Sequence, residues 1–223
     1  EGARLLPHAG KTVRLRSDCE RIPAAGCNVI ARKGGLTGER TVIVTAHIDA
    51  KKGTPGAIDN ATGVTVLFLL AELLKDYRGK HPLELLAFNG EDYYAVPGQM
   101  NFIASRNGDF SDILLNINID GAGYREGGTA FSFFNLPDNL KMTAEKVTET
   151  YPGISEGMQW VQGDHSIFVQ FGVPAIAVSS QWFLDNMETQ DVTHTPKDNL
   201  SIVNPERLPE IARAIRDLIL GLG

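Results

Sequence analysis

Short apolar runs alternate with longer amphipathic segments along the chain. Four runs predict buried β-strands, because a strand covered on both faces is almost continuous in apolar residues. These runs are residues 40–47, 83–88, 113–119 and 173–178. Residues 12–16 and 28–32 predict two early strands and are candidates for a hairpin.

The segments between these runs carry helical spacing. Residues 60–77 are apolar on most faces of a helix and are followed by Gly79, whereas residues 139–150 are amphipathic. Further helices are expected over residues 99–106, over 164–171 with Asp164 as cap, and over 205–220 with Asn204 as cap. Strands that alternate with helices indicate an α/β sandwich with a largely parallel central sheet.

Composition narrows the class of protein. With 43% hydrophobic and 22% charged residues, the 223-residue chain fits one domain, residues 1–223, with a substantial core. A net charge of −6 argues against nucleic acid or an anionic membrane as partner. No apolar run reaches the roughly 18 residues that a membrane span needs.

The sequence leaves open the cellular compartment and the redox state of the two cysteines. The chain starts at Glu1 without a signal-like segment, which is typical of a processed or trimmed form, so a cytoplasmic and a secreted location are both compatible. Cys19 and Cys27 would form one disulfide in a secreted protein or remain two thiols in a reducing compartment.

Polar side chains follow the predicted strands at the point where each strand ends. Ligands of α/β proteins gather beyond the carboxyl ends of the strands, so these side chains are expected at one edge of the sheet. They are His47, Asp49 and Asp59 after the first strong strand, Glu91 and Asp92 after the second, Asp120 after the third, and His194 in the loop after the fourth.

Taken singly, each of these residues has an ordinary explanation. His47 alone would bond backbone at a strand end, and Asp59 would cap the following helix. Asp49 changes this interpretation, since a metal-bound imidazole usually donates its second N–H to a carboxylate. Gly56 and Gly63 on either side of Asp59 would let the backbone approach closely. Lys51 and Lys52 are interpreted as a solvated pair.

The combination of these histidines and carboxylates indicates a metal-binding site. Carboxylates and imidazoles without thiolates suit zinc, cobalt or manganese. Five ligands with one shared carboxylate suit two divalent ions a few ångströms apart. Three aspartates and a hydroxide would balance two such ions, which leaves Glu91 as a carboxylate available for general-base work.

Six segments in this order resemble the M28 family of zinc peptidases, which includes dinuclear aminopeptidases, glutamate carboxypeptidase II-like enzymes and glutaminyl cyclases. The segments are "TAHIDA", "GAIDNATGV", "FNGEDYY", "NIDGAG", "GDHSIF" and "THTPKDN". The resemblance runs from about residue 28 to the C-terminus. It implies a three-layer αβα sandwich around a mixed sheet.

The resemblance also implies a role for each site residue. His47 and Asp120 would bind one zinc, Asp92 and His194 the other, and Asp59 would bridge the two. Glu91 would be the general base. Asp49 would orient His47, and Asp164 would support the site from outside the ring of ligands. A cis Asp59–Asn60 peptide bond is implied as well.

Two positions depart from the pattern of this family. Asp92 stands where relatives have glutamate, so the second metal would sit differently or bind more weakly. Thr193 stands where several relatives have a tyrosine whose hydroxyl stabilises the oxyanion. Either a metal does this alone, or Tyr93, Tyr94 or Tyr124 substitutes.

The expected function is a metal-dependent aminopeptidase that acts on peptides. A glutaminyl cyclase-like acyltransferase with a single zinc and a non-catalytic, peptidase-like binding domain are the alternatives. A carboxypeptidase would need an arginine to clamp the substrate carboxylate, for which Arg106 and Arg125 are candidates. The preferred side chain, the native metal and the oligomeric state are not readable from the sequence.

Overall fold

A single mixed β-sheet forms the centre of the molecule. The computed structural model describes residues 4–20, 23, 25–36, 38–93 and 96–222, and within them seven strands pair in the order β1-β3-β2-β4-β7-β5-β6. The strands are β1 (Val29–Lys33), β2 (Thr41–His47), β3 (Leu83–Phe88), β4 (Ile113–Ile119), β5 (Thr129–Phe134), β6 (Ile154–Glu156) and β7 (Ala175–Ser180).

The middle of the sheet is parallel. β3, β2, β4 and β7 all run in one direction, while β1 is antiparallel to β3 and β5 is antiparallel to β7. β6 pairs parallel with β5. The carboxyl ends of the four central strands therefore meet at one edge, where the polar residues of the sequence are concentrated.

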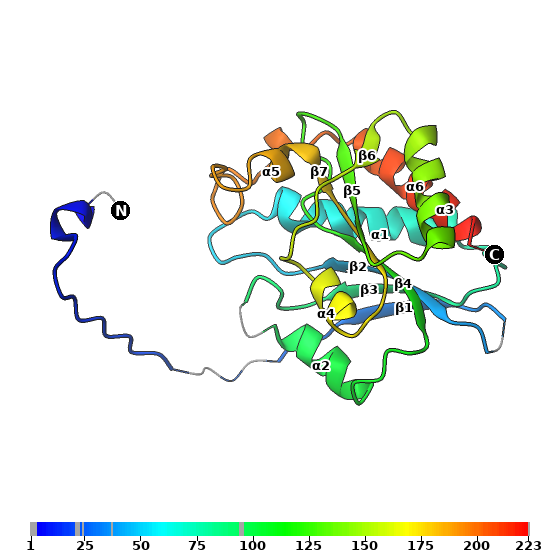
Figure 1. The fold of residues 1–223 in the computed structure, drawn as a ribbon, viewed down its shortest axis with the longest axis horizontal. Coiled ribbons are helices and arrows are strands. Elements are labelled where there is room, and N and C mark those ends of the chain that lie inside the picture. The colour runs from blue at the N-terminus through cyan, green and yellow to red at the C-terminus, as the bar shows by residue number, and fades with distance from the viewer. Residues whose placement is uncertain (1–3, 21–22, 24, 37, 94–95, 223) are drawn as a thin grey trace.

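Helices cover both faces of the sheet, as Figure 1 shows. One face carries α1 (Thr62–Leu73), α3 (Asp138–Thr150) and α6 (Arg207–Leu220), and the other carries α2 (Pro97–Ser105) and α4 (His165–Gln170). The short α5 (Gln181–Asp185) and the helical turns Leu6–His8, Ala57–Ala61 and Leu200–Ile202 complete the helices of the described residues. The expected three-layer αβα sandwich is confirmed.

Successive side chains of each strand point to opposite faces of the sheet, so the core has two layers. Val42 and Val44 of β2 pack in the larger cluster, with α1, α3 and α6, whereas Ile43 between them packs with α2 and α4. On the second face Phe102 of α2 meets Phe168 of α4 with ring centroids 5.7 Å apart. Burial on both faces explains why the central strands are apolar runs without alternation.

The predicted strands 28–32 and 40–47 are present as β1 and β2, each within one residue, but β1 pairs with β3 and does not form the candidate hairpin with residues 12–16. β3 and β4 match their predicted ranges, and β7 starts two residues late, after Pro174, which lacks the N–H that a ladder needs. β5 and β6 were not predicted. The prediction of a strand over residues 12–16 is wrong: this stretch pairs with no described strand, and Val13 and Leu15 are 76% and 93% exposed.

The ends and the capping residues of several helices differ from the predictions. α1 ends at Leu73, well before Gly79. Asp164 occupies the N-cap position of α4, but its carboxylate makes no capping bond and is used elsewhere. The prediction of Asn204 as cap is wrong: α6 begins at Arg207 with Glu206 at its N-cap position, and Oδ1 of Asn204 accepts the Glu206 N–H at 3.1 Å in the turn before the helix.

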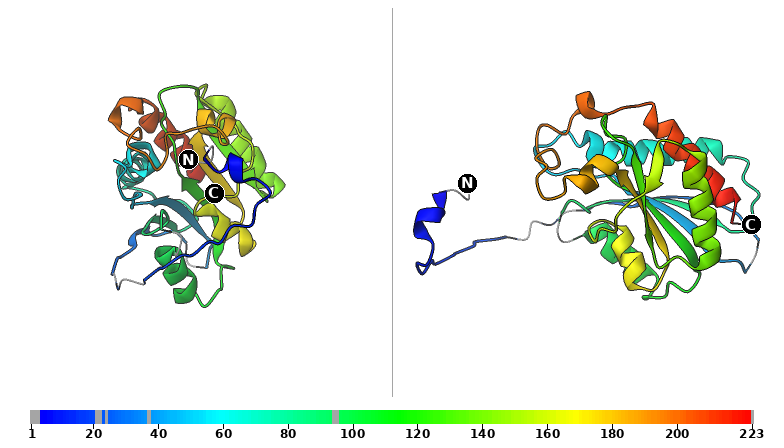
Figure 2. Two further views of the ribbon diagram at one scale, coloured as in Figure 1. Left: turned by 90° about the vertical axis from the view of Figure 1, so that its left-hand side faces the viewer. Right: turned by 45° about the horizontal axis from the view of Figure 1, so that its top comes forward.

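The N-terminal segment lies apart from the sheet. Residues 4–20 are exposed, and Figures 1 and 2 show them extending away from the body of the molecule. Cys19 and Cys27 are free and exposed in this structure. Among the described residues, no helix combines the length and the apolar character that crossing a bilayer requires.

Candidate metal centre

The predicted site residues meet at the carboxyl edge of the central strands. His47 is the last residue of β2, and Asp120 directly follows β4. Asp92 lies in the loop after β3, Asp59 lies in the turn before α1, and His194 comes from the long loop after α5. Segments nearly 150 residues apart in the chain therefore converge on one place.

Two triads of ligand atoms share one carboxylate. Nε2 of His47 lies 3.0 Å from Oδ1 of Asp59 and 3.5 Å from Oδ1 of Asp120. Nε2 of His194 lies 3.2 Å from Oδ2 of Asp59 and 2.7 Å from Oδ1 of Asp92. Within each triad the ligand atoms lie within 4.8 Å of one another. Each oxygen of Asp59 thus faces a different imidazole.

This arrangement fits divalent cations. His47 Nε2 and Asp92 Oδ2 are buried, and neither makes a hydrogen bond to any described residue, although Asp59 lies close to the imidazole. A buried polar atom without a partner is costly, so both atoms are suited to bind a cation. Nitrogen and oxygen donors without sulfur suit zinc, cobalt or manganese.

The cluster attracts positive charge even without a metal. Burial opposes protonation of His47, yet the charge of Asp120 and the nearby carboxylates of Asp49 and Asp59 raise its pKa well above the usual value. A hydrogen bond to Asp59 likewise raises the pKa of His194. Carboxylates outnumber the imidazoles here, and a bound cation would take the place of these protons.

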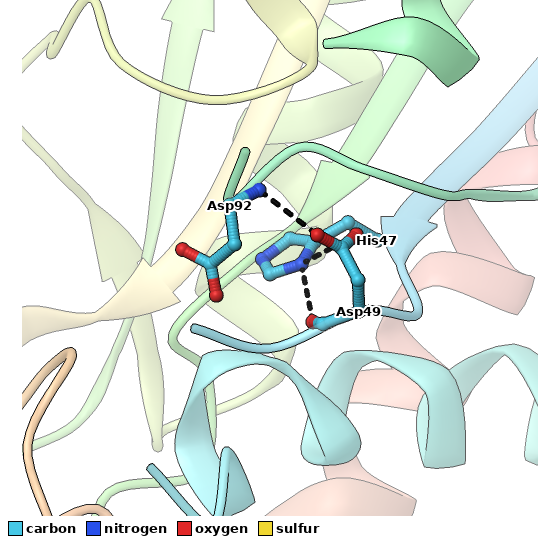
Figure 3. A group of neighbouring side chains, drawn as sticks. All are labelled: His47, Asp49 and Asp92. Atoms are coloured by element: carbon cyan, nitrogen blue, oxygen red, sulfur yellow. Dashed lines mark hydrogen bonds and ion pairs between the residues drawn. The ribbon is translucent and has the colours of Figure 1, made fainter. Parts of the chain in front are cut away.

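Asp49 holds the loop that carries two of the site residues. Its Oδ1 accepts the N–H groups of Gly90 and Glu91 at 2.7 and 3.1 Å, and its Oδ2 accepts that of Asp92 at 3.1 Å. Figure 3 shows dashed lines from the Asp92 backbone nitrogen and from the His47 ring to Asp49. Because the carboxylate is occupied by three backbone donors, Asp49 is a poor candidate for the alternative cluster with His47 and Asp92.

The backbone of Asp49, more than its side chain, orients His47. Nδ1 of His47 lies 3.0 Å from the carbonyl oxygen of Asp49 and 3.7 Å from its Oδ1. With Nδ1 donating to this carbonyl, the lone pair of the neutral imidazole is on Nε2, which faces Asp59 and Asp120. The sequence assigned this contact to the carboxylate of Asp49, whereas the shorter contact is to its carbonyl oxygen.

Asp198 is a site residue that sequence reasoning missed. It is fully buried, its Oδ1 accepts the Ile58 N–H at 2.6 Å, and its Oδ2 accepts the Asp59 N–H at 3.2 Å. The signal was available, since Asp198 is in the segment "THTPKDN" four residues after His194. Asp198 ties the loop of His194 to the turn of Asp59.

The turn around Asp59 is packed tightly against β4. The Asp59–Asn60 peptide bond is cis, as expected, and Nδ2 of Asn60 donates to the Ile119 carbonyl at 2.8 Å. Gly56 has a positive φ of 67°. A Cβ on Gly63 would lie 2.8 Å from the Ile119 carbonyl oxygen. The two glycines therefore allow the close approach that their positions in the sequence suggested.

Asp164 contacts the wall of the candidate site. It is buried, and its Oδ1 accepts Nε2 of Gln99 at 2.6 Å. Burial, together with the charges of Asp120 and Asp49, raises the pKa of Asp164 to about 7, although His47 and the bond from Gln99 act in the opposite direction. The contact fixes Gln99, which lines the cavity beside the triads.

Glu91 faces the same cavity without belonging to either triad. Burial raises its pKa to about 8, and the negative charges of Asp120, Asp164 and Asp59 add to this effect against the charge of His47. Divalent cations nearby would draw this value back down. A carboxylate that titrates in this range is suited to accept and return a proton near neutral pH.

The cavity has a volume of about 500 Å³ and is lined by two kinds of side chain. Part of the lining is charged, and among the described residues that line the cavity no lysine or arginine occurs. Its ionisable members are Asp59, Glu91, Asp92, Asp120 and His194. The cavity is also lined by apolar side chains, namely Trp160, Val161, Phe183, Leu184 and Met187.

Several other residues considered in the sequence lie elsewhere. Arg106 pairs with Asp112 at 2.7 Å, and Arg125 lies 3.4 Å from Glu126, so neither lines the cavity. Lys51 is not simply solvated, because its Nζ donates to the Asp92 carbonyl at 2.7 Å. A lysine three or four residues past a strand end can fold back onto the neighbouring loop, which the sequence pattern did not reveal.

The tyrosines proposed to replace the missing hydroxyl do not line the cavity where they are described. Tyr93 is half exposed, and Tyr124 is buried against Trp182, with ring centroids 4.5 Å apart. Tyr94 lies outside the described residues. The described part of the cavity wall therefore offers no phenol.

Fold and side-chain cluster together define the class of protein: an α/β protein with a mixed central sheet and a candidate metal centre at the carboxyl edge of its parallel strands. Residues 28–219 match the sequence profile of Peptidase family M28, so the chain belongs to this family.

Known proteins resemble the chain over most of its length. Aminopeptidase YwaD of Bacillus subtilis (strain 168) is 24% identical over 182 residues, which cover 76% of this chain and 38% of that protein. The aminopeptidase from Aneurinibacillus sp. strain AM-1 superposes with a TM-score of 0.72 at 21% identity, over 86% of this chain and 47% of that one. The chain thus spans less than half the length of these two relatives.

Two further solved structures share the fold. BSAP, a zinc aminopeptidase from Bacillus subtilis, superposes with a TM-score of 0.71 at 20% identity, over 86% of this chain and 48% of that one. The LapA aminopeptidase of Legionella pneumophila does so with a TM-score of 0.74 at 16% identity, over 87% and 54% of the two chains.

Proposed function

We propose that the protein is a metal-dependent aminopeptidase that binds two divalent ions, with zinc as the native metal. His47 and Asp120 would hold one ion, Asp92 and His194 the other, and Asp59 both. The observation that carries this proposal is the pair of triads that share Asp59, with each of its oxygens directed at a different imidazole. The zinc aminopeptidase among the structural relatives supports the choice of metal.

The charge of the cavity favours action at the amino end of a peptide. A free α-amino group is cationic and suits the acidic wall, whereas a substrate carboxylate would need a cationic clamp. Arg106 and Arg125, the candidates for such a clamp, point to other partners. The apolar part of the lining would receive the side chain of the N-terminal residue.

Bound divalent ions would polarise the scissile carbonyl and lower the pKa of the attacking water. Glu91 accepts the proton of that water as it attacks and then delivers the proton to the nitrogen of the leaving amine. Asp49 holds Glu91 in place through the backbone N–H of that residue. Gln99, fixed by Asp164, forms part of the wall beside the reacting groups.

The test combines metal content with substrate choice. We expect two equivalents of zinc per chain after saturation, and hydrolysis of aminoacyl p-nitroanilides but not of N-acetylated analogues. One equivalent of metal with release of ammonia from an N-terminal glutaminyl peptide would instead support a cyclase-like acyltransferase. Tight metal binding without turnover of any substrate would support a binding domain.

A further inference from the structure

Asp92 is a candidate ligand whose backbone is held on both sides. Its N–H donates to Oδ2 of Asp49 at 3.1 Å, and its carbonyl oxygen accepts a hydrogen bond from Nζ of Lys51 at 2.7 Å. Asp49 and Lys51 both belong to the loop that follows β2, just past His47. Both peptide groups beside Asp92 are therefore tied to one neighbouring loop.

The placement of an aspartate carboxylate depends strongly on its backbone. Two rotatable bonds join the carboxylate to the backbone, against three in glutamate, so the side chain has less freedom to correct a misplaced Cα. Oδ1 of Asp92 lies 2.7 Å from Nε2 of His194, whereas its buried Oδ2 makes no hydrogen bond to a described residue. The backbone contacts of Asp92 thus do much to fix where its carboxylate lies.

Lys51 is the partly buried member of a lysine pair, whereas Lys52 is exposed. Ordering a lysine costs side-chain entropy, so a defined contact needs a compensating gain. A hydrogen bond from an ammonium group is charge-assisted and stronger than a bond between neutral groups. The bond from Lys51 to the Asp92 carbonyl provides such a gain.

The loop after β2 also reaches the segment of His194, the imidazole of the same triad. Oγ1 of Thr54 donates to the Thr195 carbonyl at 3.0 Å, and Thr195 directly follows His194. The loop therefore contacts both segments that bring His194 and Asp92 to Asp59. Within this arrangement, Lys51 is the side chain that binds the Asp92 carbonyl.

We propose that Lys51 is a positioning residue for Asp92, and that it sets the metal affinity of the triad of Asp59, Asp92 and His194 without affecting the triad that contains His47. The inference rests on the two-metal part of the proposed function. Lys51 is not among the described residues that line the cavity, so it acts through the backbone of Asp92 and not on a substrate.

Charge and positioning predict opposite effects for the loss of Lys51. Removal of a nearby cation favours the binding of a divalent ion, because like charges repel each other. Loss of a group that holds a metal ligand in place weakens binding instead, typically by about 10- to 100-fold. The sign of the change in zinc affinity therefore distinguishes the two roles.

Three variants test the assignment by titration with zinc against a chromogenic chelator. Lys51→Met keeps the carbon stem almost unchanged and removes the ammonium group. Lys51→Arg keeps a charged donor. Lys52→Met removes the same charge from an exposed position of the same loop and is the matched control. Asp92→Ala identifies which equivalent of zinc belongs to the Asp92 triad.

We expect Lys51→Met to bind the equivalent that Asp92→Ala lacks about 10- to 100-fold more weakly than wild type, with the other equivalent unchanged. Lys51→Arg should recover most of this loss, and Lys52→Met should match wild type. Excess zinc should restore kcat in Lys51→Met by mass action. In the metal-free protein, the Asp92 N–H should exchange with solvent faster in Lys51→Met than in wild type.

The outcomes separate this inference from the proposed function. If the wild-type protein binds two zinc ions and hydrolyses aminoacyl p-nitroanilides, but Lys51→Met binds both ions as tightly as wild type or more tightly, only this inference fails. Equal losses of both equivalents would also overturn it, since they would indicate a general disturbance of the fold. The expected loss of one equivalent without hydrolysis by the wild-type protein would support Lys51 as a positioning residue and overturn the aminopeptidase function. A single zinc equivalent in the wild-type protein would overturn both.

Discussion

At the scale of single residues, Glu91 and Asp92 are neighbours in the chain with different environments. Oδ1 of Asp92 lies 2.7 Å from the His194 imidazole, whereas Glu91 belongs to neither triad and faces the cavity. Two adjacent carboxylates at a strand end are thus used in different ways. In the proposed function, Asp92 would bind metal and Glu91 would remain able to take up a proton.

Replacement of Glu91 by glutamine tests its role as the base. The amide has nearly the shape of the carboxylate but cannot accept the proton of water. We expect kcat to fall by roughly 100- to 10,000-fold, the range for loss of general-base help, while zinc content stays at the wild-type level. Stopped assays with an aminoacyl p-nitroanilide and metal analysis of the same sample measure both. Activity close to wild type would rule out Glu91 as the base.

Asp198→Asn tests the link between the Asp59 turn and the His194 loop. The variant keeps one acceptor oxygen and places an NH₂ group against a backbone N–H, so one buried donor loses its partner. We expect the free energy of unfolding of the metal-free protein to fall by about 1–3 kcal/mol, and the zinc affinity to fall as well.

A matched control for Asp198→Asn is Asp191→Asn in the same loop. Asp191 pairs with Lys197 on the surface, with 72% of its side chain exposed, so its loss should leave unfolding and zinc affinity within experimental error. Chemical denaturation and competition with a chromogenic chelator provide the measurements. Equal behaviour of the two variants would contradict a positioning role for Asp198.

At the scale of secondary-structure elements, two of the three loops that carry a candidate ligand are held by a carboxylate from the segment of another candidate ligand. Asp49, two residues after His47, binds the backbone of the Asp92 loop, and Asp198, four residues after His194, binds the Asp59 turn. Loops are usually the mobile parts of a fold. These hydrogen bonds would hold the candidate ligands in place before a metal binds.

His165 of α4 gives a prediction about pH. It is buried, with its ring centroid 4.7 Å from those of Phe134 and Trp160, and burial lowers its pKa despite a bond to the Trp160 carbonyl. The folded state thus favours the neutral ring, and its contribution is fully present above the unfolded pKa of about 6.5 and is lost as pH falls through the folded value.

His165→Gln should remove this pH dependence. We expect the metal-free variant to be less stable than the metal-free wild type at pH 8, because it loses ring contacts, but to lose less free energy of unfolding between pH 7 and pH 5. Urea denaturation at a series of pH values, with both proteins free of metal, measures the difference. Parallel curves for the two proteins over this range would show that His165 is not the titrating group.

The sequence predicted the central elements and most of the site because both follow from local patterns. β3 and β4 are apolar runs with clear ends, and the residues beyond those ends are the ones that converge. β6 has only three residues and carries no pattern of its own, and β5 was overlooked although its aromatic run lies between glycines and Asn135. Asp198 needed the fold, since its partners Ile58 and Asp59 are about 140 residues away.

At the scale of the whole molecule, the site depends on the complete sheet and on the loops beyond it. His47 and Asp120 come from the ends of adjacent parallel strands, β2 and β4, whereas Asp59, Asp92 and His194 come from three separate loops. The fold therefore brings several negative charges together at one edge, against their mutual repulsion. Bound cations would offset this repulsion, which couples metal binding to global stability.

Removal of metal should therefore destabilise the entire domain. Ligand binding to the folded state alone stabilises a protein by RT ln(1 + [L]/Kd), about 4 kcal/mol when free zinc is 1,000 times Kd. We expect the melting temperature to drop on treatment with a chelator and to return on addition of zinc, in one cooperative transition. Glu91→Gln should keep this zinc-dependent shift in full, since Glu91 lies outside both triads, whereas Asp59→Ala should lose most of it because both sites share that residue. Differential scanning calorimetry at fixed zinc activity provides the measurement, and a shift of the same size in Asp59→Ala as in wild type would contradict a shared ligand.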